Sequence, residues 1–219
     1  GGVKMLQIFL KGILAGIAIR LGSWLNLRAN SMFSNTLIGS ILFTIGLILI
    51  CNFDFFLYTG KVCYLYEDHK KENILRLLLG LIGNAVGWLI MGLLLRAAFV
   101  DDYVSLFTSL DSMVTHKLDS VWYLKCIKSF FCGMLVYLAV EGFNKIENNF
   151  GKYVVLVLCI SGFIYAGFEH CVANMFYFSL AQSFTLETLV ALLLCILFNS
   201  FGGLFIPTIN WLIKKTSKE

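Results

Sequence analysis

The sequence predicts an all-α membrane protein, in which six transmembrane helices form two inverted three-helix repeats and the second and fifth helices are broken. Of the 219 residues, 59% are hydrophobic and only 14% are charged, whereas charged residues make up about 25% of a typical soluble domain. The apolar residues form about six runs of roughly 20 residues, each long enough to cross a bilayer. Polar residues interrupt the second and fifth runs, as in transporters built from inverted repeats.

The first predicted span covers about residues 5–25. Its small residues, which include Gly12 and Gly16, allow a neighbouring helix to approach closely. Lys11 and Arg20 lie in the same span, where they could line an anion entrance or extend to the lipid headgroups. The chain starts with glycine instead of methionine, and we expect native residues to precede it.

The second span begins near Asn35 and continues to Ile50, after which Asn52 and Asp54 interrupt it. A short apolar piece follows, and the charged cluster at 67–73 returns the chain to water. Irregular backbone at membrane depth is tolerated only where protein buries it or where it lines a water-filled cavity. The interruption therefore predicts a polar loop that points inward.

The third and fourth spans cover about residues 74–99 and 121–140, and residues 100–120 form the longest polar connection between spans. The third contains Asn84 within GNAVG, and the fourth contains Lys125 and Lys128. Glycines on both sides of a polar residue are typical of a close helix contact.

The fifth span starts near Tyr153 and carries the segment GFEHCVANMFY, which places Glu169 and His170 between apolar runs. Ionisable residues at membrane depth are costly and usually mark a pathway or a site. The sixth span, about residues 186–213, contains Asn199 within NSFGG.

The third and sixth spans share a pattern in which an asparagine is followed three residues later by glycine, at 84/87 and 199/202. Because three crossings reverse the direction of the chain, the second copy must be inverted. We therefore expect a single domain over residues 1–219, with repeats at about 1–100 and 120–219.

The positive charges of the loops predict the orientation. Lysines gather at the N-terminus, in two of the loops and at the C-terminus: Lys4, Lys70, Lys71, Lys145, Lys152, Lys214, Lys215 and Lys218. Cytoplasmic loops carry an excess of lysine and arginine. We expect a multi-pass protein of the inner (plasma) membrane with both termini in the cytoplasm.

The polar groups at the two interruptions suit an anion. A helix that begins at membrane depth exposes N–H groups with about half a positive charge. Thr59 can donate a hydroxyl hydrogen bond, and His170 can donate an imidazole N–H or a full charge. We expect Glu169 to accept hydrogen bonds from backbone N–H groups of an interruption. The alternative for His170 is a hydrogen-bonded packing residue.

Other polar and apolar residues have structural alternatives. Asn84 and Asn199 are expected to bind the broken backbone instead of substrate. Phe43, Leu47 and Phe163 could narrow the path, and ordinary packing is the equal alternative.

Several classes of function are excluded. The formal net charge of +4 is too small to indicate a nucleic-acid partner. The seven cysteines form no CxxC pair, so no metal site is expected. No GxSxG, HExxH or P-loop motif is present, which argues against an enzyme. An aquaporin needs two Asn-Pro-Ala turns, and this chain has the single proline Pro207. A conduit for small anions remains.

The run AGFEHCVANMFY at 166–177 closely resembles the GFEHxxANMF signature of the formate/nitrite transporter family. Further similarities are LYTG at 57–60, GNAVG at 83–87, LVYLAV at 135–140 and NSFGG at 199–203. The resemblance implies an aquaporin-like fold and a homopentamer in the lipid bilayer with one pore in each protomer. It also implies passage of formate, nitrite or hydrosulfide without a cofactor.

The resemblance also implies roles for individual residues. The central histidine of the family falls on His170 and the threonine of the loop on Thr59. The apolar constrictions fall on Phe43, Leu47, Leu57, Tyr58 and Phe163. The asparagines of the third and sixth helices fall on Asn84 and Asn199. We expect Glu169, Asn174 and Lys128 to be further supporting residues.

The chain departs from the family pattern at three positions. Phe56 stands where the family usually has an acidic residue, and Asp54 lies two residues earlier. Gly133 and Glu141 replace an asparagine and a tryptophan that are common in the family. The anion is therefore left open, and so is the mode of transport: a channel, a proton-coupled carrier that uses His170, or a non-conducting membrane scaffold.

Overall fold

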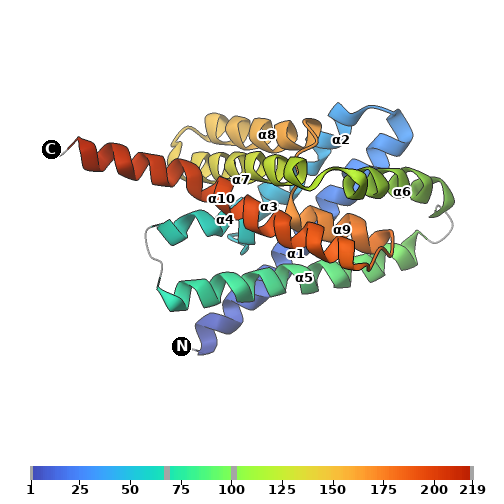
Figure 1. The fold of residues 1–219 in the computed structure, drawn as a ribbon, viewed down its shortest axis with the longest axis horizontal. Helices are drawn as coiled ribbons and strands as arrows, with labels where there is room; N and C mark the ends of the chain where they lie inside the picture. The colour runs from blue at the N-terminus through green and yellow to red at the C-terminus, as the bar shows by residue number, and fades with distance from the viewer. Residues whose placement is uncertain (1, 67–69, 100–102, 218–219) are drawn as a thin grey trace.

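The computed structural model describes residues 2–66, 70–99 and 103–217, with the backbone alone for 103–109, and within these ranges it contains helices and no strand (Figure 1). Lys218, residues 67–69 of the charged cluster and residues 100–102 of the predicted polar connection lie outside this part. The helices are α1 (Gly2–Phe33), α2 (Thr36–Phe43), α3 (Ile45–Asn52), α4 (Tyr58–Lys61), the 3-10 helix η1 (Val62–Tyr66), α5 (Lys71–Ala98), α6 (Tyr103–Asp119), α7 (Trp122–Lys145), α8 (Asn149–Tyr165), α9 (Cys171–Leu180) and α10 (Leu186–Thr216).

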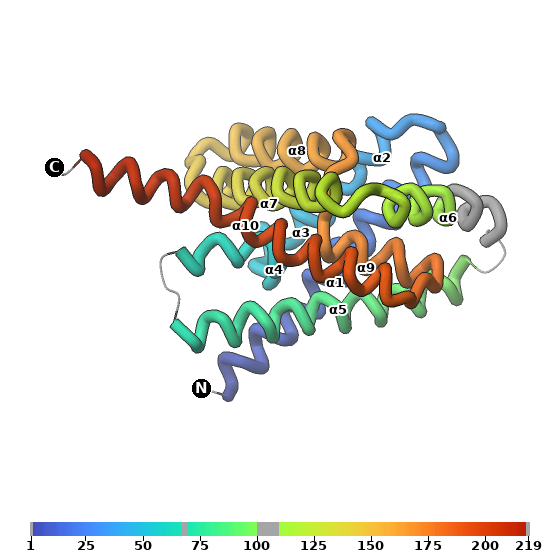
Figure 2. The backbone as a smooth tube through the Cα atoms, in the orientation of Figure 1, coloured from blue at the N-terminus to red at the C-terminus, as the bar shows by residue number. Residues whose placement is uncertain are grey.

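Four helices, α1, α5, α7 and α10, are long and apolar enough to cross a membrane. The shorter apolar helices are α8, α9, and the stretch that α2 and α3 make up together. Figure 2 shows that most of these helices run along the long axis of one bundle. Both termini lie at one end of that bundle, and α6 lies toward the other end (Figure 1). The expectation of an all-α membrane protein is confirmed at this level.

Two long helix pairs form the frame of the bundle: α1 packs along α5, and α7 packs along α10. Glycine allows the first pair to come close, because a Cβ on Gly16 would meet the carbonyl oxygen of Asn84 and one on Gly87 would meet that of Ile13. Such contacts between small residues are a common means of packing membrane helices.

The α7–α10 pair uses glycine in the same way. A Cβ on Gly133 would meet the carbonyl oxygen of Asn199, and one on Gly202 would meet that of Phe130. In both pairs one of the glycines therefore lies against the backbone of a buried asparagine. This contact holds the asparagine at a defined height in the bundle.

The segment that we predicted as a polar connection contains a helix, α6. Its apolar residues Leu110, Val114 and Leu118 recur every four positions, and Leu110 and Val114 are buried. This spacing places them on one face of a helix, which packs on α1, α9 and α10. Polar residues between these positions, such as Asp111, interrupt the apolar pattern in the sequence.

Two irregular segments separate helices that lie inside the bundle: residues 53–57 between α3 and α4, and residues 166–170 between α8 and α9. Each contains one residue with positive φ, Asp54 at 50° and Gly167 at 70°. Glycine enters this left-handed region without a steric penalty, and aspartate does so more readily than most residues. These turns aim the first residues of α4 and α9 toward each other.

Candidate functional site

The two irregular segments meet at a pair of buried side chains. Oγ1 of Thr59, in the first turn of α4, lies 2.9 Å from Nε2 of His170, the N-cap residue of α9. Thr59 is fully buried, and His170 is 2% exposed. The structure thus brings together the two polar residues that we predicted from separate segments of the chain.

The hydrogen bond of Nδ1, the other ring nitrogen of His170, determines whether Nε2 or the Thr59 hydroxyl is the donor in this pair. Nδ1 accepts a hydrogen bond of 3.2 Å from the backbone N–H of Ala173. In a neutral imidazole one nitrogen accepts and the other carries the proton. Nε2 of His170 is therefore the donor to Thr59 Oγ1, an assignment that follows from the hydrogen-bond network. The hydroxyl proton of Thr59 is then available to another acceptor.

Asn84 of α5 links the first irregular segment to α4 and α1 through three hydrogen bonds. Its Oδ1 accepts from the N–H of Tyr58 at 3.0 Å, and its Nδ2 donates to the carbonyl oxygens of Phe56 at 2.8 Å and Gly12 at 2.9 Å. The side chain is fully buried. One amide thus binds two backbone groups at the interruption, the N–H of Tyr58 and the carbonyl of Phe56, and ties them to the carbonyl of Gly12 on α1.

Asn199 of α10 does the same for the second segment. Its Oδ1 accepts from the N–H of Cys171 at 2.9 Å, and its Nδ2 donates to the carbonyl oxygens of Glu169 at 2.8 Å and Ser129 at 2.7 Å. It is also fully buried. The N–H groups of Tyr58 and Cys171, which we expected to be open to an anion, are occupied by the two asparagines.

Glu169 has partners other than those we predicted. Its Oε2 accepts from Lys117 Nζ at 2.6 Å and from Asn174 Nδ2 at 2.7 Å. In the described part of the chain its carboxylate accepts no backbone N–H, and only its main-chain oxygen takes part in the interruption. The expectation that this carboxylate would hold the broken backbone is wrong, because Asn199 already does so.

Lys117, from α6, is a site residue that the sequence analysis missed. Its side chain is 15% exposed, and its ammonium also lies 5.7 Å from the centre of the Tyr177 ring. Burial disfavours the charged form, but the Glu169 carboxylate outweighs it and raises the pKa of the Lys117 ammonium. The available signal was position, since Lys117 follows Leu110 by seven residues and Val114 by three, on the buried face of the helix.

A cavity of about 260 Å³ opens on His170 from the α6 side. It is lined by residues of α1, α2, α6, α7, α8, α9 and the segment between the last two: Asn26, Asn30, Thr36, Met113, His116, Lys117, Lys128, Ile164, Tyr165, Gly167, Phe168, Glu169, His170, Ala173, Asn174 and Tyr177. Lys128 is half-buried in this wall. Two lysines and one ion-paired carboxylate give the lining a net positive charge.

Aromatic rings lie beside the histidine. Phe163 stacks on the His170 ring with 5.7 Å between ring centres, and Phe43 meets Phe163 edge-on at 5.8 Å. Both phenylalanines are fully buried. They form an apolar layer directly next to the polar pair.

The remaining apolar candidates are also buried. Leu47 is fully buried, Leu57 is 1% exposed and Tyr58 is 9% exposed. The hydroxyl of Tyr58 shares a hydrogen bond of 2.8 Å with Oγ of Ser200 on α10. Leu57 and Tyr58 immediately precede Thr59, so the polar pair has apolar neighbours beside the threonine as well as Phe163 beside the histidine.

The structure separates the two basic residues of the first predicted span. Lys11 Nζ lies 2.5 Å from Asp54 Oδ2, and Lys61 Nζ lies 3.4 Å from the other oxygen of this carboxylate, at an exposed position. Arg20 does not extend to the surface, because its side chain is buried against Trp88 and Phe176.

The ionisable residues of the described ranges show no arrangement suited to a metal ion, since no three His, Cys, Asp or Glu side chains gather at one point. The seven cysteines are free thiols. The chemistry that the site offers is hydrogen bonding and charge.

The chain is similar to known proteins along most of its length. The sequence profile described as formate/nitrite transporter matches residues 2–213. A protein described as formate channel FocA from Haemophilus influenzae is 25% identical over 181 residues, which are 77% of this chain and 64% of that protein. The chain thus spans less than two thirds of the length of this curated relative.

Two solved structures are similar along nearly the whole chain. A structure described as a pentameric formate channel with formate bound has a TM-score of 0.80 at 26% identity, covering 98% of this chain and 99% of that one. Another, described as an FNT family ion channel, has a TM-score of 0.83 at 23% identity, covering 95% and 90%. The second likeness concerns the fold alone.

Proposed function

Because this chain belongs to the formate/nitrite transporter family, we propose that it passes small monovalent anions across a membrane along a path centred on Thr59 and His170. The family is one of transporters and not of enzymes. The observation that carries the proposal is the 2.9 Å contact between these two side chains where the two irregular segments meet. An anion that reaches this point would find hydrogen-bond donors in an otherwise apolar environment.

The donors of the path are side chains. The N–H groups of Tyr58 and Cys171 are held by asparagines, so they serve the backbone geometry. The hydroxyl of Thr59 and the Nε2–H of His170 remain for the anion, which would replace the contact that these groups make with each other. An anion held by hydrogen bonds without a fixed charge can also leave.

Six spans arranged as two inverted repeats are part of the proposal. The first repeat would comprise α1, the broken span from α2 to η1, and α5; the second would comprise α7, the broken span α8–α9, and α10. Support comes from Asn84 and Asn199, each of which binds an N–H and the carbonyl two residues before it. Broken helices at matching positions of two repeats usually mark the substrate site. The whole chain, residues 1–219, would form this one domain.

The apolar residues would act as constrictions on either side of the donors. Phe43 and Phe163 lie toward the His170 ring, and Leu47, Leu57 and Tyr58 would narrow the opposite side. Glu169, Asn174 and Lys128 would shape the charge of the cavity through which the anion arrives. Asn84 and Asn199 would hold the two turns in place.

We propose a homopentamer with one path in each protomer. Support comes from the similar structure described as pentameric and from the large apolar side chains that α5 and α10 expose, such as Leu78 and Leu197. The inner membrane is part of the proposal, and the lysines at the chain ends favour an orientation with both termini in the cytoplasm. Both termini lie at the same end of the bundle, as this orientation requires (Figure 1).

Formate is the first anion to test, because the relative from Haemophilus influenzae and one similar structure are described as formate channels. Nitrite and hydrosulfide are the alternatives, since Phe56 lacks the charge that is usual in the family. The test is flux into liposomes with a panel of formate, nitrite, hydrosulfide, acetate and chloride. A non-conducting scaffold would give no flux with any of them.

A second candidate is a proton-coupled carrier, which the buried, titratable His170 favours. A pH gradient imposed without an anion gradient separates the two modes. A carrier would accumulate the anion against its concentration, beyond what the distribution of the neutral acid predicts, whereas a channel would not.

A further inference from the structure

A second cavity, of about 380 Å³, lies between the end of α5, the end of α9 and the turn that leads to α10. Arg20 of α1 and Arg96 of α5 both line it. This second cavity shares no lining residue with the cavity next to His170. The two cavities are therefore lined by different residues.

Arg20 is a buried cation without a carboxylate partner in the described part of the chain. Its side chain is 2% exposed, its Nη1 donates to the carbonyl oxygen of Trp88 at 2.8 Å, and its buried Nε has no partner. A guanidinium does not lose its proton in proteins. An isolated charge at such a position is costly unless an anion compensates it.

The neighbours of Arg20 hold its guanidinium in place and compensate part of the charge. The guanidinium carbon lies 4.6 Å from the centre of the Phe176 ring and 5.6 Å from that of Trp88. Aromatic faces attract a cation, although more weakly than an anion does. Gly92 leaves the space that the guanidinium occupies, because a Cβ there would meet its atoms.

The rim of the cavity is apolar and exposed. Leu89 is 52% exposed, Leu93 is 63% exposed and Phe184 is 76% exposed. A cavity with guanidinium groups inside and an exposed apolar rim is complementary to an amphiphile with an anionic head. A small inorganic anion would leave this rim uncovered.

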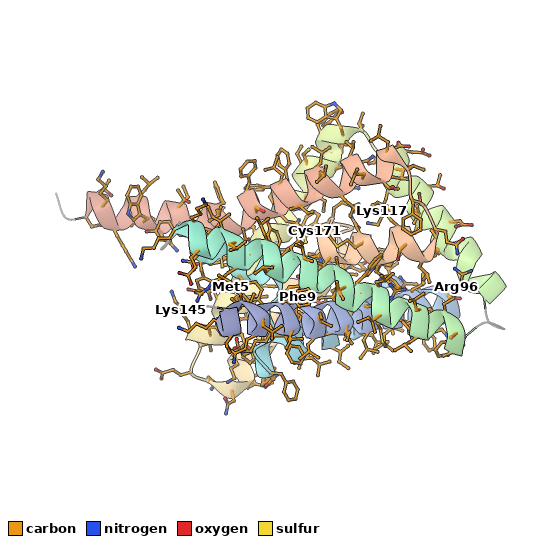
Figure 3. The ribbon with its side chains drawn as sticks, turned by 90° about the horizontal axis from the view of Figure 1, so that it is seen from below. Met5, Phe9, Arg96, Lys117, Lys145 and Cys171 are labelled. Carbon is orange, nitrogen blue, oxygen red and sulfur yellow. The ribbon has the colours of Figure 1, made fainter. Side chains whose placement is uncertain are left out.

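The position of the cavity along the bundle agrees with a lipid headgroup. Arg96 lies two residues before the end of α5 at Ala98, and Figure 3 shows it at the end of the bundle opposite Met5 and Lys145. Phospholipid headgroups lie at both ends of membrane-spanning helices, outside the hydrocarbon core. Arginine is well suited to phosphate because its planar group donates two parallel hydrogen bonds.

We propose that this cavity binds a membrane phospholipid, with the phosphate on Arg20 and the acyl chains along Leu89 and Leu93. The site lies outside the anion path. It would couple the packing of α1, α5 and α9 to the surrounding lipid, independently of the anion that the protein passes.

The test is native mass spectrometry of the delipidated oligomer, titrated with phosphatidylglycerol. We expect one lipid per protomer, and a dissociation constant at least about tenfold higher in Arg20→Met, since a charge-assisted bidentate contact is lost. Lys152→Met is the matched control, because it removes one positive charge from the other end of the bundle. It should bind the lipid as the unchanged protein does.

Inorganic phosphate distinguishes a lipid site from a free-anion site. It should bind more weakly than phosphatidylglycerol, and Leu93→Gln should weaken the lipid without weakening phosphate. If Arg20→Met does not fold, Leu93→Gln decides alone. Equal binding of lipid by the variants and the unchanged protein would overturn the proposal, as would phosphate binding as tight as that of the lipid. Dissociation of the oligomer by Arg20→Met with unaltered lipid binding would identify a carboxylate of a second copy as the anion instead.

Discussion

The hydroxyl oxygen of Thr59 lies 2.9 Å from Nε2 of His170, although the two residues are 111 positions apart in the chain. Nδ1 of the same imidazole accepts from the N–H of Ala173. The histidine is therefore both the N-cap of α9 and the donor to the threonine. Capping fixes the orientation of the ring, and this leaves Nε2 directed at the proposed path.

Thr59→Val should reduce anion flux about tenfold or more while the protein still folds. The substitution keeps the shape of the side chain but removes a hydroxyl donor from a buried site, a loss of about 1–3 kcal/mol. Flux into liposomes is the measurement. Thr208→Val, which removes a hydroxyl from an exposed position of α10, should leave flux unaltered; equal flux in all three proteins would place Thr59 in packing only.

His170→Asn should flatten the dependence of flux on pH. Asparagine keeps a hydrogen-bond donor but cannot titrate. In the unchanged protein a falling pH makes His170 either hold the anion as an imidazolium or hand it a proton, and both alter flux. The profiles are measured from about pH 4.5 to 8, across the usual range of histidine titration, and are corrected for ionisation of the anion.

Superimposable pH profiles of the two proteins would contradict this role of His170. They would make it a structural residue that caps α9. The remaining pH response would then belong to the anion.

Asn199→Leu and Asn84→Leu should each destabilise the folded protein strongly and by similar amounts. Each leaves the buried N–H of Tyr58 or Cys171 without its partner and removes a hydrogen bond from two carbonyl oxygens, and a buried polar group without a partner costs about 1–3 kcal/mol. The midpoint of thermal unfolding in detergent is the measurement, with Asn210→Leu at an exposed position of α10 as the control. A large effect of one substitution and none of the other would argue against two equivalent repeats.

Lys117→Met should lower anion flux, because it leaves the buried Glu169 carboxylate unpaired beside His170, where it would repel an anion. Glu169→Gln in the same protein removes that charge and should restore part of the flux. Lys152→Met provides the matched loss of a lysine far from the site. If the double variant were no better than Lys117→Met, loss of α6 packing would explain the defect instead.

The pH dependence of this ion pair has a definite sign. The pKa of Lys117 is raised above its usual value of 10.5 by Glu169. A raised pKa in the folded protein means that the stability which the lysine contributes is fully present below its unfolded value and is lost as pH rises through the folded value. We therefore expect the unfolding midpoint of the unchanged protein to fall, through loss of this contribution, only above about pH 10.5. The Lys117→Met variant should not show this fall.

The sequence by itself determined the membrane class, the family and the residues at the two interruptions. Hydropathy is a local property, because about 20 consecutive apolar residues suffice to cross a bilayer wherever they lie in the chain. A polar residue in such a run is costly, so Thr59, Asn84 and His170 were visible as candidates without coordinates. The motif around His170 is contiguous and could be compared with a family directly.

The tertiary structure alone decided which groups meet. Lys117 lies 52 residues from Glu169 in a segment whose polar composition indicated a loop, so its pairing could not be read from local sequence. Arg20 could have reached the headgroups or lined a path, and only the packing of α1 on α5 and α9 shows it buried. Hydrogen bonds and ion pairs depend on contacts of a few ångströms between distant segments, and these distances are set by how the helices pack.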